Sequence, residues 1–234
     1  MAKKSKLYRA QLEKFEKLKV YPLIDAIKLL KELPAVKFDQ TVELSFKLGV
    51  DPKQTDQTVR GAVPLPRGTG KSVTVVVIAD EEKQINEAKE AGADVVGFDE
   101  VIARIKGGWT DFDVLIATPS SMSQVRPLGR QLGPKGLMPN PKTGTVTDKV
   151  ADAVKEAKAG RVEFRADKGA CVQVPVGKLS FEADALLENI NVVIDALDKA
   201  KPATAKGVYF ISCTLSSTMS PGVRINTKEL VRVK

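Results

Sequence analysis

The run SVTVVVIA, residues 72–79, sets the architecture of the middle of this chain. It is rich in β-branched apolar residues, as is typical of a strand that is buried on both faces of a parallel sheet. Helical patterns over 81–91 and 100–106 follow it, and short apolar segments come after them at 94–97 and 114–117. Strand, helix, strand, helix and strand in short succession predict βαβ units. We therefore expect a small, doubly wound α/β domain in this part of the sequence.

The stretch QTVELSFKL, residues 40–48, follows a different pattern. Apolar side chains occupy its even positions from Val42 to Leu48, and polar ones occupy its odd positions from Thr41 to Lys47. A period of two predicts a strand with one buried side and one polar, solvent-facing side. Such a strand belongs to a sheet that is covered on one face only.

The rest of the chain supports a split arrangement of two α/β-class domains. Further expected elements are helices at 7–19, 23–33, 122–132, 148–159 and 181–199, a partner for the alternating strand at 59–65, a hairpin of 162–165 with 171–176, and a strand at 207–216 before a turn at 217–222. We expect residues 1–68 and 160–234 to form one α+β domain. Residues 69–159 would be an inserted α/β domain, with glycine-bearing hinges at both crossings.

The charge of the chain is unevenly distributed. The 234 residues carry a net charge of +8, with an isoelectric point near 9.4, which favours polyanionic partners such as nucleic acid. Between Asp80 and Asp113, ten acidic residues face only four basic ones, so that stretch carries −6 and the remainder carries +14. One part of the molecule should therefore attract phosphate much more strongly than the other.

Several functional classes are excluded by composition. The chain has no histidine, which removes Ser-His and Cys-His nucleophiles and imidazole zinc sites. Cys171 and Cys213 stand alone and are expected to be reduced, small core residues. No apolar run is long enough to cross a membrane, and no secretory signal is present. We expect a soluble, cytoplasmic protein that needs no metal and no cofactor.

A rival hypothesis is a nucleotide-dependent enzyme that uses the inserted α/β domain. The stretch RGTGKS, residues 67–72, looks like the end of a phosphate-binding loop. Such a loop must lead from a strand into a helix, whereas Lys71 and Ser72 lead into the apolar strand, so a flexible hinge is the favoured interpretation. The acidic residues near Asp80 and Asp113 lack a spacing that fixes metal ligands. The glycine- and proline-rich loop 133–144 is either a connector or a basic RNA contact.

Basic residues near both chain ends indicate an RNA-binding face. Lys3, Lys4, Lys6 and Arg9 precede the first expected helix, and Lys37 and Phe38 stand just before the alternating strand. Aromatic residues make up only 5% of the chain, too few for a broad base-stacking platform. Recognition of folded RNA through its shape, phosphates and 2′-hydroxyls fits better. Phe38 would then contact RNA, with a place in the core as the alternative.

Four stretches together resemble one protein family. They are LGPKGLMPNPKTGTV (132–146), DQTVRGAVPLPRGTGKSV (56–73), AGADVVG (91–97) and SSTMSPGVRI (216–225). They resemble the bacterial L-one family of large-subunit ribosomal proteins, the stalk protein, and the resemblance extends over essentially the whole chain. It implies a discontinuous α+β domain with an inserted Rossmann-like, three-layer α/β domain. It also implies a structural constituent of the large ribosomal subunit and no enzymatic activity.

The resemblance also implies partners and contact residues. The partners are large-subunit rRNA at the mobile side stalk, exit-site tRNA whose release in the deacylated form is assisted, and the protein's own operon mRNA, which is repressed. A purely regulatory mRNA repressor would use the same RNA surface. The rRNA contacts carried over are Lys37, Phe38, Thr41, Glu43, Arg165, Lys168, Thr218, Met219 and Ser220, supported by Lys3, Lys4, Lys6 and Arg9. At position 220 the family usually has glycine, a residue that allows RNA to approach the backbone closely, and this chain departs from that pattern with Ser220.

Overall fold

The computed structural model describes residues 5–34 and 36–230. The chain divides into two compact units, which we call the discontinuous unit (Met1–Gly70 with Val162–Lys234) and the inserted unit (Lys71–Arg161). Each unit combines a sheet with helices, so the expected mixed α/β class is confirmed. The divisions lie two residues beyond the boundaries expected from sequence.

A five-stranded sheet forms the centre of the discontinuous unit. Its order is β1 (Val20–Tyr21), β10 (Val223–Ile225), β9 (Phe210–Ser217), β2 (Thr41–Leu48) and β8 (Cys171–Lys178). The alternating strand β2 therefore lies between two strands from the second half of the chain and runs antiparallel to both. Neither segment of this unit can complete the sheet without the other.

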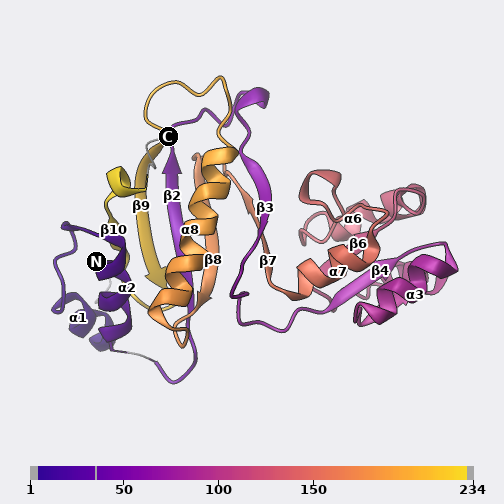
Figure 1. Ribbon diagram of the computed structural model, residues 1–234, viewed down its shortest axis with the longest axis horizontal. Helices are drawn as coiled ribbons and strands as arrows, with labels where there is room; N and C mark the ends of the chain where they lie inside the picture. Colours follow the sequence, from indigo (N-terminus) through magenta and orange to yellow (C-terminus); the bar gives the residue numbers. More distant parts are fainter. Residues whose placement is uncertain (1–4, 35, 231–234) are drawn as a thin grey trace. The chain divides into compact units, whose positions relative to one another are not determined.

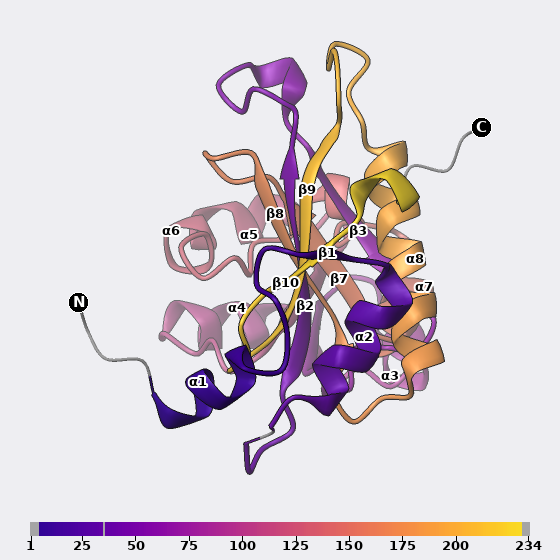
Figure 2. The same ribbon diagram turned by 90° about the vertical axis from the view of Figure 1, so that its left-hand side faces the viewer.

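Helices α2 (Leu23–Glu32) and α8 (Ala183–Lys199) pack on one and the same face of this sheet (Figure 1, Figure 2). The even positions of β2 point toward them, and Val42 and Leu44 are fully buried. Burial of each such side chain stabilises the fold by about 1.5–3 kcal/mol. The odd positions are exposed or half-buried, so the predicted one-sided strand is observed. Shorter elements of the unit are α1 (Lys6–Leu12), η1 (Thr55–Gln57) and η4 (Thr227–Glu229).

The inserted unit is a three-layer arrangement around a parallel sheet in the order β5-β4-β6. The strands are β4 (Val75–Ile78), β5 (Val95–Gly97) and β6 (Val114–Ala117). Side chains from one face of β4 pack with α3 (Glu82–Glu90) and α7 (Val150–Lys158), and those from the other face pack with α4 (Asp99–Lys106) and the segment 122–132. All four β4 residues are fully buried, as the continuous apolar run predicts.

Two expected strand pairings are wrong. Strand β7 (Arg161–Arg165) pairs with β3 (Arg60–Pro64) in a separate two-stranded sheet, so β7 forms no hairpin with β8 and β3 does not pair with β2. Gly61 of β3 and Phe164 of β7 approach each other closely: a Cβ at position 61 would lie 2.6 Å from the ring of Phe164. The strands β3 and β7 therefore form a sheet of their own, while β2 and β8 belong to the five-stranded sheet.

Two expected helices are shorter than their sequence patterns. The helix expected over 7–19 ends at Leu12, and Leu18 is 76% exposed instead of packing on the core. Phe15 leaves the helical line to pack edge-on against Tyr21, with 6.4 Å between ring centroids. The helix expected over 122–132 is broken at Pro127, which lacks a backbone N–H. The resulting pieces are α5 (Met122–Val125), η2 (Arg126–Leu128) and α6 (Gly129–Leu132), and η3 (Pro141–Thr143) lies in the irregular loop beyond them.

Candidate nucleic-acid interface

The start of β2 and the turn between β9 and β10 are joined by direct hydrogen bonds. The backbone N–H of Thr218 donates to the carbonyl oxygen of Thr41 at 3.1 Å. In return, the Thr41 N–H donates to Oγ1 of Thr218, also at 3.1 Å. Two residues that are 177 positions apart in sequence thus become neighbours, as the RNA-contact prediction requires.

Gln40 fixes this turn by accepting two hydrogen bonds from it. Its side chain is buried, with 2% exposed, and its Oε1 accepts hydrogen bonds from Oγ of Ser217 and from the backbone N–H of Met219, each at 2.9 Å. Sequence reasoning missed Gln40. A signal was present, because position 40 continues the even, core-facing register of β2, where a polar residue needs buried partners.

Ser220 closes the turn with its own side chain. Its Oγ accepts from the Ser217 N–H at 2.8 Å and donates to the carbonyl oxygen of Pro221 at 3.1 Å. Among the described non-glycine residues, only Ala170 has a positive φ, so the backbone at Ser220 does not require glycine. The departure from the family pattern is therefore compatible with this turn conformation.

Two large apolar side chains are exposed to solvent beside the start of β2 and the turn after β9. Phe38 is 53% exposed and Met219 is 51% exposed. Phe38 lines a shallow hollow with Gln40, Leu179 and Ser180, so the alternative that placed it in the core is wrong. Exposed apolar groups beside a hydrogen-bonded turn provide contact area for a partner. We call Phe38, Gln40, Thr41, Thr218 and Met219 the strand-start cluster.

Lys178 adds a cation that sequence reasoning did not single out. It lies opposite Thr41 in the β2–β8 register, and its Nζ donates to Oγ1 of Thr41 at 3.2 Å. Nearby, the Asp39 carboxylate accepts hydrogen bonds from Ser180, from its N–H at 3.2 Å and its Oγ at 2.8 Å. Lys37 and Glu43 are exposed. The cluster thus combines fixed hydroxyls, apolar surface and cations.

Arg165 and Lys168 do not join the strand-start cluster. They lie at the end of β7 and in the turn before β8, and the first residue of β8, Cys171, pairs with Lys47 at the far end of β2. Six residues of extended strand separate Thr41 from Lys47, which is about 20 Å. Both side chains are exposed. The predicted contacts therefore form two groups at opposite ends of one strand.

The basic N-terminal residues are only partly described. Lys6 and Arg9 lie on α1 and are exposed. Lys3 and Lys4 lie outside the described residues, so their predicted contacts have no structural counterpart here.

The net positive charge belongs entirely to the discontinuous unit. This unit contains 24 Lys and Arg residues against 16 Asp and Glu residues, whereas the inserted unit contains 13 of each. The acidic stretch from Asp80 to Asp113 is thus balanced by basic residues elsewhere in the inserted unit. The discontinuous unit, which holds both groups of predicted contacts, should therefore attract a polyanion at long range more strongly than the inserted unit does.

Other candidate sites have less support. Lys71 and Ser72 lead into β4 and not into a helix, so no helix N-terminus is available to hold a phosphate behind RGTGKS. Within residues 5–34 and 36–230, no group of three or more His, Cys, Asp or Glu side chains is placed to hold a metal ion. No helix in that same part of the chain is long and apolar enough to span a membrane.

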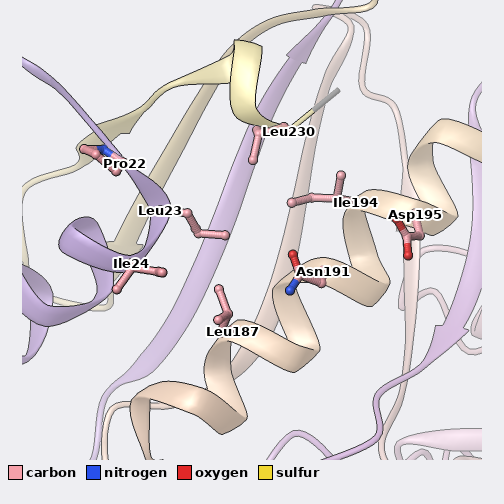
Figure 3. Close-up of a pocket in the computed structure, with 8 residues that line it drawn as sticks. All are labelled: Pro22, Leu23, Ile24, Leu187, Asn191, Ile194, Asp195 and Leu230. Atoms are coloured by element: carbon pink, nitrogen blue, oxygen red, sulfur yellow. The ribbon is translucent and has the colours of Figure 1, made fainter. Parts of the chain in front are cut away.

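An apolar groove lies between α2, α8 and the segment around Leu230, away from the strand-start cluster (Figure 3). Leu23, Leu187 and Ile194 line it, with Asn191 and Asp195 as its polar members. None of the predicted RNA contacts contributes to this groove, so it plays no part in the candidate interface.

Comparison with known proteins bears on this interface. The model of the ribosomal protein L1p/L10e family matches residues 29–221. A large ribosomal subunit protein uL1 from Macrococcus caseolyticus (strain JCSC5402) is 53% identical over 230 residues, which cover 98% of this chain and 99% of the relative. Another protein of that name, from Chlamydia pneumoniae, is 52% identical over 231 residues, covering 99% of each. The matched region includes the strand-start cluster, Arg165 and Lys168.

Proposed function

Because this chain belongs to the ribosomal protein L1p/L10e family, we propose that it binds large-subunit rRNA at the mobile side stalk through the strand-start cluster. The family membership makes it a ribosomal protein of the large subunit and not an enzyme, as predicted. The observation that carries the proposal is the turn at Thr218 and Met219, which is fixed to β2 by hydrogen bonds while Met219 stays exposed.

The division of labour within the interface follows from its chemistry. Rigid polar and apolar groups at the strand-start cluster discriminate between RNAs, because they require a matching surface. Lys37, Lys178, Arg165 and Lys168 attract phosphate regardless of sequence, and their contribution falls as salt rises. Lys6 and Arg9 add to this general attraction. We also propose that the two units are separate domains and that the discontinuous one carries the rRNA affinity.

Further steps of the proposed function use the same surface. Bound at the stalk near the exit site, the protein would contact deacylated tRNA and assist its release. When rRNA is scarce, it would bind its own operon mRNA and repress translation. We propose that both activities take place in the cytoplasm, the first of them on the ribosome. Repression would be measured in a cell-free translation reaction with the operon leader, and the stalk rRNA fragment should relieve it by competition.

The test of rRNA binding compares two kinds of substitution. Met219→Ala and Thr218→Ala should each weaken binding to a stalk rRNA fragment by about 1–3 kcal/mol, by analogy with central interface contacts, and leave the salt dependence unchanged. Lys6→Ala should instead weaken binding to all RNAs alike and lower the salt dependence.

Thr204→Ala, at an exposed threonine beyond α8, is the matched control. If the two turn variants fold normally and bind the fragment as tightly as the unaltered protein, the strand-start cluster is not the rRNA site.

A further inference from the structure

The groove between α2, α8 and Leu230 gathers apolar side chains at the surface of the discontinuous unit. Leu23 of α2 points across it toward Leu187 and Ile194 of α8 (Figure 3). Ile24, which lines the same groove, is 53% exposed. A single exposed apolar residue is ordinary, but apolar surface collected in a groove indicates a contact site.

The α8 side of the groove is acidic. Over Ala183–Lys199 the helix carries four carboxylates and one lysine, a net charge of −3. Its groove-facing stripe, with spacings of three or four residues, consists of Asp184, Leu187, Asn191, Asp195 and Asp198. This charge repels a polyanion, so the groove suits an occupant that is both apolar and cationic.

The chain itself supplies a segment of this kind. Leu230 lines the groove and is 5% exposed. Residues 231–234, which lie beyond the described part of the chain, continue from it with the sequence VRVK. Side chains alternate along an extended segment, so Val231 and Val233 share one side and the two cations share the other. One side of the segment thus matches the apolar walls, and the other matches the carboxylates.

The lengths of the segment and of the groove also agree. From Leu187 to Asp195, α8 advances by eight positions, or about 12 Å. Four extended residues span at most about 13–14 Å. Because the segment starts at Leu230, which already lines the groove, its docking closes no long loop and costs little loop entropy.

We propose that residues 231–234 dock in this groove of the same molecule, with both valines against its apolar walls and with Arg232 beside Asp195. The segment then covers the apolar surface that α2 and α8 leave open and holds the start of α2 against α8. This contact is independent of RNA binding, because the groove contains none of the predicted RNA contacts.

The test measures how fast a cysteine in the groove reacts with N-ethylmaleimide. Asn191→Cys is made in a Cys171→Ser background, both in the full chain and in a chain that stops after Leu230; Cys213 is 1% exposed and should not react. A segment that is docked for about 80% of the time should slow labelling about fivefold in the full chain. Thr204→Cys, at an exposed position beyond α8, is the control and should react equally in both chains.

Substitutions in the full chain identify the contacts. Replacing both Val231 and Val233 by serine should raise the labelling rate to that of the shortened chain, because the docked state loses its apolar contacts. Val208→Ser, at a valine that is 72% exposed, should leave the rate unchanged. Asp195→Lys should raise the rate, and adding Arg232→Glu to that variant should lower it again, as expected for a charge pair.

Three results would overturn the proposal. The first is equal labelling of the groove cysteine with and without residues 231–234, in proteins that share one circular dichroism spectrum. The second is protection that disappears on dilution, because the segment in the groove would then belong to a second copy. The third is unchanged protection in the double serine variant, which decides the matter even if the shortened chain does not fold.

Discussion

Replacing Gln40 by methionine should loosen the turn that carries Thr218 and Met219. Methionine has nearly the same length and fills the buried site, but it has no oxygen to accept hydrogen bonds. The Ser217 hydroxyl, on a residue only 6% exposed, would lose its acceptor, at a cost of about 1–3 kcal/mol for a buried unsatisfied donor. The Met219 N–H lies in an exposed turn where water can replace the acceptor, so its loss costs about 0.5–1.5 kcal/mol.

The free energy of unfolding should therefore fall by roughly 2–4 kcal/mol, as measured by urea denaturation. Binding to the stalk rRNA fragment should weaken as well, because a turn that samples several conformations must be ordered on binding. Gln40→Glu separates the two effects. Its carboxylate can accept both hydrogen bonds, so RNA affinity should be largely retained, whereas burial of a charge should still lower stability.

Gln131→Met, at an exposed glutamine of the inserted unit, is the matched control and should change neither quantity. The reasoning is refuted if folded Gln40→Met protein binds rRNA like the unaltered chain, or if Gln40→Glu binds no better than Gln40→Met. Either result would mean that Gln40 is only a packing residue and does not position the turn.

Three further predictions concern single side chains. Ser220→Gly should lower the free energy of unfolding by about 1 kcal/mol through its lost hydrogen bonds, yet bind rRNA as well as the serine form; a tenfold loss of affinity would contradict this. The hydrogen bond from the Val75 N–H lowers the pKa of Asp94 below its usual 3.8, so its stabilisation is present above that pH and is lost as the pH falls through the native value. Melts between pH 7 and 2.5 should show a smaller acid-induced drop in Asp94→Asn than in the unaltered protein. Burial raises the pKa of Cys213 to about 12, so iodoacetamide at pH 8 should modify half-buried Cys171 first, as mapped by mass spectrometry; equal labelling of the native protein would show otherwise.

Much of the fold could be predicted from the sequence because its strands have opposite environments. The period of two in β2 and the continuous apolar run around β4 each report how many faces are buried, and both patterns proved correct. Strand pairing was less predictable. Strands β3 and β7 are short, and no pattern in their own residues indicates which strand each one pairs with. The close approach of Phe164 to Gly61 becomes visible only in three dimensions.

The candidate site shows the same division. The alternating pattern of β2 predicted from sequence alone that Thr41 and Glu43 lie on its solvent-facing side, and the structure agrees. The hydrogen bonds between Thr41 and Thr218 span 177 positions, a separation that no local pattern can reveal. Gln40 was overlooked because a buried polar residue is recognised by its partners, and those partners come from the other end of the chain.

Because β2 lies between β8 and β9, the discontinuous unit cannot complete its sheet until late in synthesis. During synthesis, β2 emerges with apolar side chains such as Leu44 and Phe46, but both of its neighbours lie more than a hundred residues downstream. At a translation rate of roughly 5–20 residues per second, the nascent segment waits roughly ten to thirty seconds for the end of β9. The inserted unit, which is contiguous in sequence, can condense during that interval. Folding on the ribosome should thus run from the middle of the chain outward, because the N-terminal segment cannot complete its sheet until the last strands have been made.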